Sequence, residues 1–332
     1  MTNPVLYEDI TSLADEPLWG ALKGASLLIT GATGMLGAYM ALAADIANKK
    51  YGYEIRLLLM GRDRKKLEPL YQDAHAEFFF QDIREPILYK NPFDYIIHLA
   101  GPVGPIVFQD SPGEVLAVNV EGSLNLLRHI TRFGCASIVL ASTHEVYGGT
   151  QNERMEDDLL LLPDSMNPRA CYVLGKLAAE NAITGYKAPG KSARLSRLFG
   201  PLMNRNSGLF ICDFINQIEK EKTICIHGDA SQLRPLCYIS DAASALLYIL
   251  VRGENQSAYN VQGKELTTMY DVAKIIAERY SAKIILGKPE TASWQPSGYW
   301  LNTRKLERLG WKPMINLCNG VDKFYRFEQN KR

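Results

Sequence analysis

The chain has 332 residues, of which 47% are hydrophobic, and a formal net charge of +1 from 37 basic and 36 acidic residues. This length and composition allow a sizeable core in one or two domains. The near-zero net charge argues against a nucleic-acid surface or a polybasic membrane anchor, so we expect neither kind of partner. No apolar run approaches the roughly 18 residues of a membrane span, and residues 1–24 lack a signal-peptide pattern.

The six cysteines are scattered and contain no Cys-x-x-Cys pair. This spacing argues against both a metal site and a disulfide framework. We therefore expect a reduced, cytoplasmic protein that holds no metal. Residues 1–24 have no assignable role, and we expect them to pack against the larger domain.

Strand patterns alternate with helical patterns along the first two hundred residues. Strands are predicted over 26–30, 55–60, 77–80, 94–99, 137–141 and 194–199, and helices over 38–47, 113–133 and 169–186. The alternation predicts an α/β fold, a Rossmann-type doubly wound parallel sheet with helices on both faces.

After Gly200-Pro201 the predicted elements become shorter and aromatic residues more frequent. We predict a dinucleotide-binding domain over 1–200, with a return segment at about 236–263 that includes a helix over 241–251. Residues 201–235 and 264–332 are predicted to form a smaller substrate-binding region.

A glycine-rich turn joins the first predicted strand to the first predicted helix. It reads Gly31-Ala32-Thr33-Gly34-Met35-Leu36-Gly37, with the spacing G-x-x-G-x-x-G rather than G-x-G-x-x-G. Such glycines let the backbone approach a pyrophosphate, which binds at the helix N-terminus. We predict cofactor contacts from Gly31, Thr33, Gly34, Met35, Leu36 and Gly37.

Tyr172 and Lys176 are four residues apart in a predicted helix, so their side chains share one face. The lysine charge favours phenolate and lowers the pKa of the tyrosine towards that of a general base. Such a base takes a proton from a carbinol while hydride leaves for a nicotinamide. This pair predicts an oxidoreductase-type site.

Further motifs follow in order along the chain. They are Gln81-Asp82-Ile83, His98-Leu99-Ala100-Gly101, Asn119-Val120-Glu121-Gly122-Ser123, Ala141-Ser142-Thr143-His144-Glu145-Val146-Tyr147-Gly148, Arg194-x-x-x-x-Phe199-Gly200-Pro201 and Arg234-x-x-x-Tyr238-Ile239-Ser240-Asp241. With these motifs, residues 26 to about 313 resemble the extended short-chain dehydrogenase/reductase family, in particular its nucleotide-sugar epimerases, dehydratases and decarboxylases. The resemblance implies bound NAD, a nucleotide-diphosphate sugar substrate, and a homodimer through the two helices that end near Phe133 and Tyr186.

The resemblance also implies roles for single residues. Asp82 and Ile83 match the pair that contacts the adenine, and residues 101–105 match the nicotinamide side of the cleft. Leu99, Ala100, Gly101, Tyr172 and Lys176 are assigned to the cofactor, Lys176 through the nicotinamide ribose. Asn119 is either part of this site or an amide that packs a helix.

On the substrate side, Thr143 matches the residue that hydrogen-bonds the reacting hydroxyl beside Tyr172. Arg234 matches an arginine that binds the substrate diphosphate, for which a guanidinium fork is well shaped. Arg197 stands where the family often has Asn. The residues assigned to substrate binding are Pro102, Val103, Thr143, His144, Arg197 and Arg234.

Glu145 reduces the number of reactions that the resemblance allows. In the family, dehydratases and uronate decarboxylases carry a glutamate two residues after the threonine, whereas simple 4-epimerases usually lack it. Dehydratases add an Asp acid between the two, where this chain has His144, either an imidazolium acid or a packing residue. The loop Gly101-Pro102-Val103-Gly104-Pro105 resembles the Ser-Pro-Ala-Ser-Pro loop of UDP-glucuronate decarboxylases.

We therefore expect a UDP-glucuronate decarboxylase-like enzyme with Thr143, Glu145, Tyr172 and Lys176 as catalytic residues. A 4-epimerase, a 4,6-dehydratase, an NADPH-dependent 4-ketosugar reductase and a non-catalytic dinucleotide sensor remain alternatives. At the end of the second predicted strand, Arg62 or Arg64 stands near the place of the usual Asp and also suits the 2′-phosphate of NADP. A redox-neutral cycle favours NAD.

Overall fold

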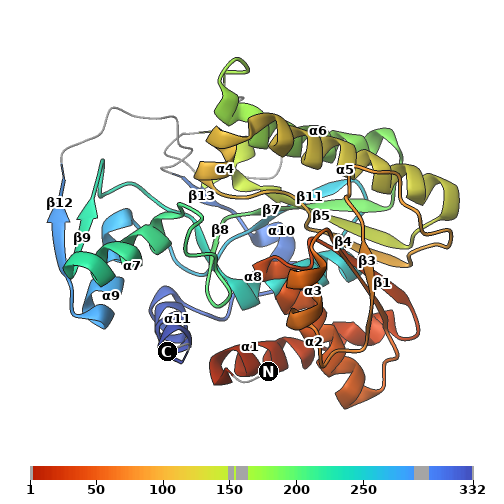
Figure 1. The fold of residues 1–332 in the computed structure, drawn as a ribbon, viewed down its shortest axis with the longest axis horizontal. Coiled ribbons are helices and arrows are strands. Elements are labelled where there is room, and N and C mark those ends of the chain that lie inside the picture. The colour runs from red at the N-terminus through yellow and green to blue at the C-terminus, as the bar shows by residue number, and fades with distance from the viewer. Residues whose placement is uncertain (1–2, 149–152, 155–163, 288–298, 331–332) are drawn as a thin grey trace.

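The computed structural model describes residues 3–148, 153–154, 164–287 and 299–330. Its centre is a seven-stranded parallel sheet in the order β11-β7-β5-β4-β1-β2-β3 (Figure 1). The strands are β1 (Ser26–Thr30), β2 (Arg56–Gly61), β3 (Ala76–Phe80), β4 (Tyr95–His98), β5 (Ser137–Thr143), β7 (Gly190–Leu195) and β11 (Ser257–Val261). Strand order reverses direction between β1 and β4, and the predicted Rossmann-type fold is confirmed.

Helices cover both faces of this sheet. On one face, α2 (Met35–Tyr51) and α8 (Ile239–Arg252) pack against each other and the strands, and α5 (Pro112–Phe133) packs along α6 (Cys171–Gly185) on the other. β1 and β5 are buried at every position because both of their faces are covered. The short helix α3 (Arg64–Leu70) connects β2 to β3, and the short helix α4 (Pro105–Asp110) directly precedes α5.

The predicted strand over 194–199 has the wrong bounds. β7 begins four residues earlier, at Gly190, and the chain leaves the central sheet after Leu195. β8 (Arg197–Phe199) then pairs with β10 (Leu236–Tyr238) in a separate two-stranded sheet. The start of β7 contains Lys191, whose buried ammonium donates a hydrogen bond to Ser137 Oγ at 2.7 Å. A charged residue at this position interrupts the apolar run by which a buried strand is predicted.

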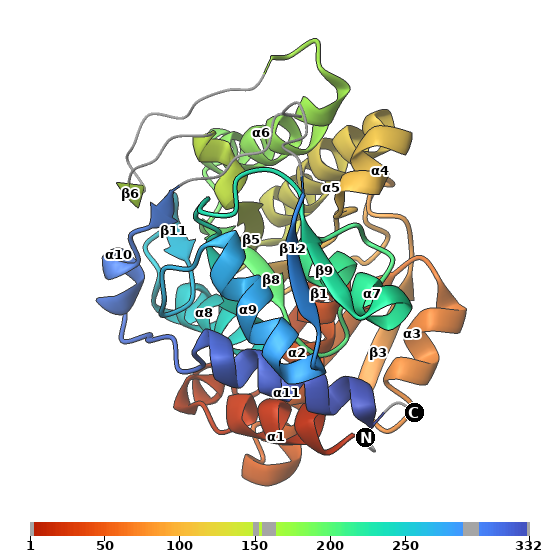
Figure 2. The ribbon, with the colours of Figure 1, turned by 90° about the vertical axis from the view of Figure 1, so that its left-hand side faces the viewer.

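Four of the elements after residue 200 gather at one side of the molecule, which faces the viewer in Figure 2. There α7 (Phe210–Glu221) and α9 (Met269–Tyr280) pack with the parallel pair β9 (Thr223–Ile226) and β12 (Lys283–Leu286). The remaining elements are β6 (Glu153–Arg154), which pairs with β13 (Trp300–Leu301), and the helices α10 (Arg304–Glu307) and α11 (Leu317–Gln329). α8 and β11 lie with the large sheet. The division into domains stays a prediction.

The N-terminal segment forms α1 (Pro4–Ala14) and a 3₁₀ turn, η1 (Pro17–Leu22). α1 packs against α2 and α8, which cover one face of the central sheet, and against α11. Asp9 is its buried centre: Oδ2 accepts hydrogen bonds from the phenols of Tyr39 at 2.9 Å and Tyr238 at 2.7 Å, and Oδ1 accepts from Lys323 Nζ at 2.9 Å. These partners lie in α2, β10 and α11, so one carboxylate joins three distant parts of the chain.

Within the part of the chain that the structure describes, no helix is both long and apolar enough to cross a membrane.

We predict that Asp9→Ala lowers the free energy of unfolding by about 3 kcal/mol, because it leaves two buried phenols without their acceptor and leaves the half-buried ammonium of Lys323 with Glu8 alone. The matched control is Glu8→Ala, which removes the other carboxylate on Lys323, at 2.6 Å, from an exposed position. That loss is expected to stay below about 1 kcal/mol. Urea unfolding of both variants measures the difference, and equal losses would contradict the central role of Asp9.

Candidate active site

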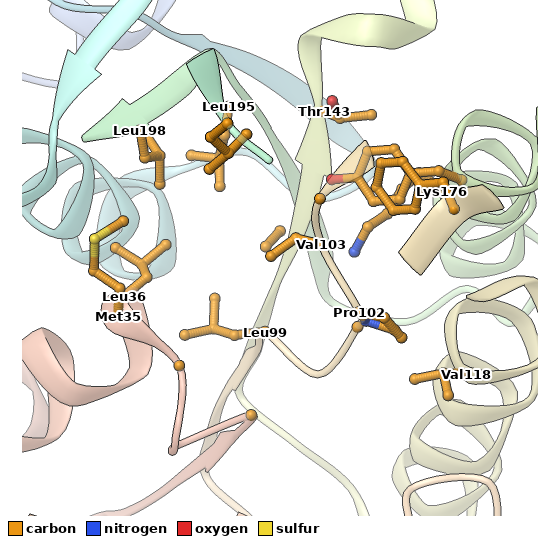
Figure 3. Close-up of a pocket in the computed structure, with 18 of the residues that line it drawn as sticks. Met35, Leu36, Leu99, Pro102, Val103, Val118, Thr143, Lys176, Leu195 and Leu198 are labelled. Atoms are coloured by element: carbon orange, nitrogen blue, oxygen red, sulfur yellow. The ribbon is translucent and has the colours of Figure 1, made fainter. Parts of the chain in front are cut away.

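A cavity of about 1030 Å³ opens along the carboxyl ends of the parallel strands, where open α/β sheets bind ligands. Figure 3 shows Met35 and Leu36, at the start of α2, on one side and Thr143 and Lys176 on the other. The predicted site residues that line it are Gly31, Thr33, Gly34, Met35, Leu36, Gly37, Arg62, Asp82, Ile83, Leu99, Ala100, Gly101, Pro102, Val103, Thr143, His144, Glu145, Tyr172, Lys176, Arg197 and Arg234. The fold thus brings twenty-one predicted residues, from Gly31 to Arg234, into one cavity.

The glycine turn is pressed against the end of β4. Gly31 has φ +67°, and a methyl group on it would lie 2.8 Å from Ala100 N. A methyl group on Gly37 would lie 2.6 Å from Gly31 O. Thr30 Oγ1 accepts hydrogen bonds from the backbone N–H groups of Leu99, at 3.2 Å, and Ala100, at 3.1 Å, which ties the two strand ends together. A larger residue at 31 would force the strand ends apart, and a larger residue at 37 would push α2 away from the turn.

The N-terminus of α2 faces this cavity. Its N-cap is Gly34, which supplies no side-chain hydrogen bond to the first turn, and Gly34 to Gly37 line the wall. The first N–H groups of a helix favour an anion. The free backbone N–H groups, together with the absence of side chains at Gly34 and Gly37, therefore fit the pyrophosphate of a dinucleotide.

The wall of the cavity near Arg62 and Asp82 carries an ion-pair cluster. Arg84 hydrogen-bonds Asp82 with Nη2 at 2.9 Å, which lowers the pKa of Asp82 to about 2, and Arg62 Nη1 lies 3.3 Å from the same carboxylate. Arg64 instead stacks on Phe80, 4.0 Å from the ring centroid. Of the two arginines considered for a 2′-phosphate, Arg62 lines the cavity and Arg64 does not.

Asn119 is the predicted site residue that does not line the cavity. It is buried in α5, and its Nδ2 donates to Val115 O at 2.8 Å. A methyl group on Gly101 would lie 3.0 Å from Asn119 Oδ1 and 3.4 Å from Lys176 Nζ, so Asn119 lies behind the Gly101 loop. A methyl group on Gly175 would lie 3.0 Å from Asn119 Cβ. The structure places Asn119 at the contact between α5 and α6.

Thr143, Tyr172 and Lys176 meet where β5 ends beside α6. Thr143 is the last residue of β5 and hydrogen-bonds Tyr172. Lys176 is 4% exposed, and its Nζ lies 5.9 Å from the centroid of the Tyr172 ring. The pKa of Tyr172 is nevertheless raised, because burial and the Glu145 charge outweigh the Thr143 hydrogen bond and the Arg169 charge. The expectation that Lys176 lowers the pKa of Tyr172 is wrong for this structure.

Glu145 is held by Arg169, a residue that the sequence reasoning missed. Arg169 Nη2 donates to Glu145 Oε2 at 2.8 Å, and both side chains are largely buried. The Arg169 guanidinium lies over the Phe108 ring at 4.6 Å, and Phe108 in turn stacks on Tyr172 with ring centroids 4.5 Å apart. The available signal was spacing, because Arg169 precedes Tyr172 by three residues, although in the structure it lies in a 3₁₀ turn just before α6.

His144 is hydrogen-bonded to Tyr299. The sequence did not predict a role for Tyr299, because 155 residues separate it from His144. Nδ1 of His144 lies 2.6 Å from the phenol of Tyr299, which also donates to the carbonyl O of His144 at 2.8 Å. Burial, followed by the charges of Arg197, Arg234 and Arg169, lowers the pKa of His144 well below its usual value. The imidazole is therefore neutral at physiological pH, and the alternative of an imidazolium acid is not supported.

Two more cations, Arg197 and Arg234, line the cavity. Burial and the charge of Arg197 lower the pKa of Arg234 to about 9. Within the described residues, Arg234 Nε and Nη1 are buried and have no hydrogen-bond partner. The Arg234 backbone is fixed by Thr267, through Arg234 N to Thr267 O at 2.7 Å and Thr267 Oγ1 to Arg234 O at 2.9 Å. Clustered buried guanidiniums of this kind favour an anionic ligand.

Comparison with known proteins agrees with this geometry. Residues 27–261 match the family described as the NAD dependent epimerase/dehydratase family. The chain belongs to this family. Its cofactor is NAD, for which the glycine turn and the N-terminus of α2 provide the fitting site.

Individual members of the epimerase/dehydratase family are similar over most of the chain. UDP-glucuronic acid decarboxylase 1 of Danio rerio is 30% identical over 311 residues, which cover 91% of this chain and 72% of that protein. UDP-glucuronic acid decarboxylase 5 of Arabidopsis thaliana is 28% identical over 300 residues, covering 89% and 86%. The crystal structure of UDP-glucuronic acid 4-epimerase from Bacillus cereus with UDP-glucuronic acid and NAD has a TM-score of 0.78 at 19% identity, covering 92% of this chain and 100% of that chain, and so shares its fold.

We predict that Lys176→Met stabilises the cofactor-free protein below pH 8. Burial lowers the pKa of Lys176 from 10.5 to about 8, so between these values the folded state binds fewer protons than the unfolded state. The cost of the buried charge, about 3 kcal/mol, is fully present below pH 8 and disappears as the pH rises to 10.5.

Denaturant unfolding between pH 6.5 and 10.5 measures this cost. The advantage of Lys176→Met over the wild type should shrink through that window. Lys220→Met, at an exposed position in α7, controls for the change of residue type. A pH-independent advantage would show that the gain comes from packing instead of charge.

Proposed function

We propose that this enzyme is UDP-glucuronate decarboxylase-like: it oxidises a nucleotide-linked uronate at C4, releases carbon dioxide and returns the hydride to give a pentose. The observation that carries the proposal is the Glu145–Arg169 pair beside Thr143 and Tyr172. The two relatives named as UDP-glucuronic acid decarboxylases support it.

The oxidation step uses the residues at the end of β5. Thr143 and Tyr172 hold the C4 hydroxyl, and Tyr172 takes its proton. The Thr143 hydrogen bond and the Arg169 charge both favour the phenolate and so act against the burial that keeps the phenol protonated. NAD held by the glycine turn and the first turn of α2 would supply the hydride acceptor for C4 and, later in the cycle, the hydride donor, and Lys176 lines the same cavity.

Decarboxylation follows from the C4 ketone. The bond between C5 and the carboxylate breaks, carbon dioxide leaves, and its electron pair passes into the enolate of the ketone. A proton from water is then added to C5 in place of the carboxylate. Arg169 and Arg197 favour the uronate carboxylate in the cavity, Arg234 favours the diphosphate, and Glu145 orients the ring or a water near C5.

The alternatives differ in what they require. A 4,6-dehydratase needs an acid at position 144, and the neutral, buried His144 does not provide it. A 4-epimerase needs no Glu145, yet Glu145 is held in place by an ion pair. A 4-ketosugar reductase consumes NADPH, for which Arg62 at the adenosine end is the supporting residue.

Incubation of the purified protein with UDP-glucuronate and NAD tests the proposal. We expect carbon dioxide and a UDP-pentose, with no net change in NAD. Retained carboxylate with inversion at C4 would establish an epimerase, and net NADPH consumption a reductase.

We predict that Glu145→Gln slows carbon dioxide release at least about 100-fold, because Arg169 loses its charged partner and the ring its orienting carboxylate. The first hydride transfer should persist and appear as transient absorbance of reduced cofactor. Glu114→Gln, in an Arg–Glu pair with Arg84 at the surface, should keep full activity. Full decarboxylation by Glu145→Gln would remove Glu145 from the mechanism.

We also propose a cytoplasmic homodimer that pairs through α5 and α6. Partly exposed Leu116 on α5 and Tyr186 at the end of α6 support such a contact, and the six free cysteines fit a reducing compartment. Light scattering that gives the mass of one chain would refute the dimer.

A further inference from the structure

The hydrogen bonds of His144 determine which ring nitrogen carries the proton. The Tyr299 phenol has one hydrogen, and it donates this hydrogen to the carbonyl O of His144 at 2.8 Å, since a carbonyl can only accept. Nδ1 of His144 lies 2.6 Å from the same phenol oxygen. Nδ1 must therefore be the N–H that donates to Tyr299, which leaves a lone pair on Nε2.

The surroundings keep this ring neutral. His144 is 2% exposed, lines the cavity, and is surrounded by the guanidiniums of Arg169, Arg197 and Arg234, each of which opposes protonation. Its ring makes no other hydrogen bond within the described part of the chain. Nε2 is therefore an acceptor with no partner from the described residues, at the wall of the substrate cavity.

We propose that Nε2 of His144 accepts a hydrogen bond from a hydroxyl group of the sugar, and that Tyr299 is the positioning residue that fixes the required tautomer. A lone pair attracts a hydroxyl hydrogen and repels a carboxylate oxygen, whereas the neighbouring guanidiniums do the opposite. Position 144 therefore selects a sugar that presents a hydroxyl there and directs the acidic substituent towards the arginines. This inference rests on the proposed function for the choice of a uronate.

The tautomer can be measured without turnover. In holoenzyme labelled with ¹⁵N-histidine, long-range ¹⁵N–¹H correlation should show His144 with a protonated Nδ1 and an unprotonated Nε2 throughout pH 5.5–8.5. Loss of the signal in His144→Gln assigns it among the five histidines. In Tyr299→Phe the ring should lose its preference and show both tautomers. A wild-type ring protonated at Nε2 would overturn the proposal.

The hydroxyl contact is tested by binding. In a Tyr172→Phe background, which prevents turnover, UDP-glucuronate and its 2-deoxy and 3-deoxy analogues are titrated by calorimetry. We expect one deoxy analogue to bind about tenfold more weakly than the parent. In His144→Leu this difference should vanish, and in His144→Gln, which keeps an acceptor, it should partly return. Equal deoxy penalties with and without His144 would overturn the proposal.

Failure of the proposed function would look different. If the deoxy penalty depends on His144, yet the wild-type enzyme releases no carbon dioxide, the decarboxylase proposal fails. The hydrogen bond from the sugar hydroxyl to His144 is then still supported. Addition of UDP alone should leave the Nε2 resonance in place, and a shift with UDP equal to that with UDP-glucuronate would assign the contact to the nucleotide and overturn the sugar-hydroxyl contact.

Discussion

The close approach of Gly31 to the end of β4 is the constraint on which the site depends. Strand order reverses between β1 and β4, so the connections leave these neighbouring strands towards opposite faces and open a crevice at their carboxyl ends. Thr30 holds the two ends together through Leu99 N and Ala100 N, and the absence of a side chain at Gly31 lets them meet. The exposed first turn of α2 and the loop from Gly101 then face the same cavity.

The buried cations of the cavity favour anionic ligands and lower the stability of the ligand-free protein. Lys176, Arg197 and Arg234 line it, and burial lowers the pKa of both Lys176 and Arg234. Charges held away from water destabilise the folded protein unless a partner compensates them. Because anionic ligands supply that compensation, the substrate and cofactor should stabilise the fold as well as react within it.

The part of the site around His144 and Glu145 is assembled from distant segments of the chain. Tyr299 comes from the C-terminal part of the chain to fix His144 at the end of β5, and Arg169 reaches Glu145 from the turn before α6. Asp9 likewise joins α1 to α2, β10 and α11. Buried polar contacts of this kind define how the C-terminal elements sit on the sheet, since each has a required geometry that apolar packing lacks.

The sequence by itself determined the architecture and the cofactor end. The apolar runs of the strands, the glycine turn and the Tyr172–Lys176 spacing are local patterns, and local patterns follow from backbone geometry over a few residues. The start of β7 was not predicted, because it contains the polar residue Lys191. Lys191 is buried through a hydrogen bond to Ser137, which lies in another strand and which no local pattern shows. Tertiary structure alone decided the protonation of Tyr172 and His144, the pairing of Glu145 with Arg169, and the place of Asn119 behind the Gly101 loop. Those properties depend on burial and on charges from remote segments, which act through space and leave no periodic trace along the chain.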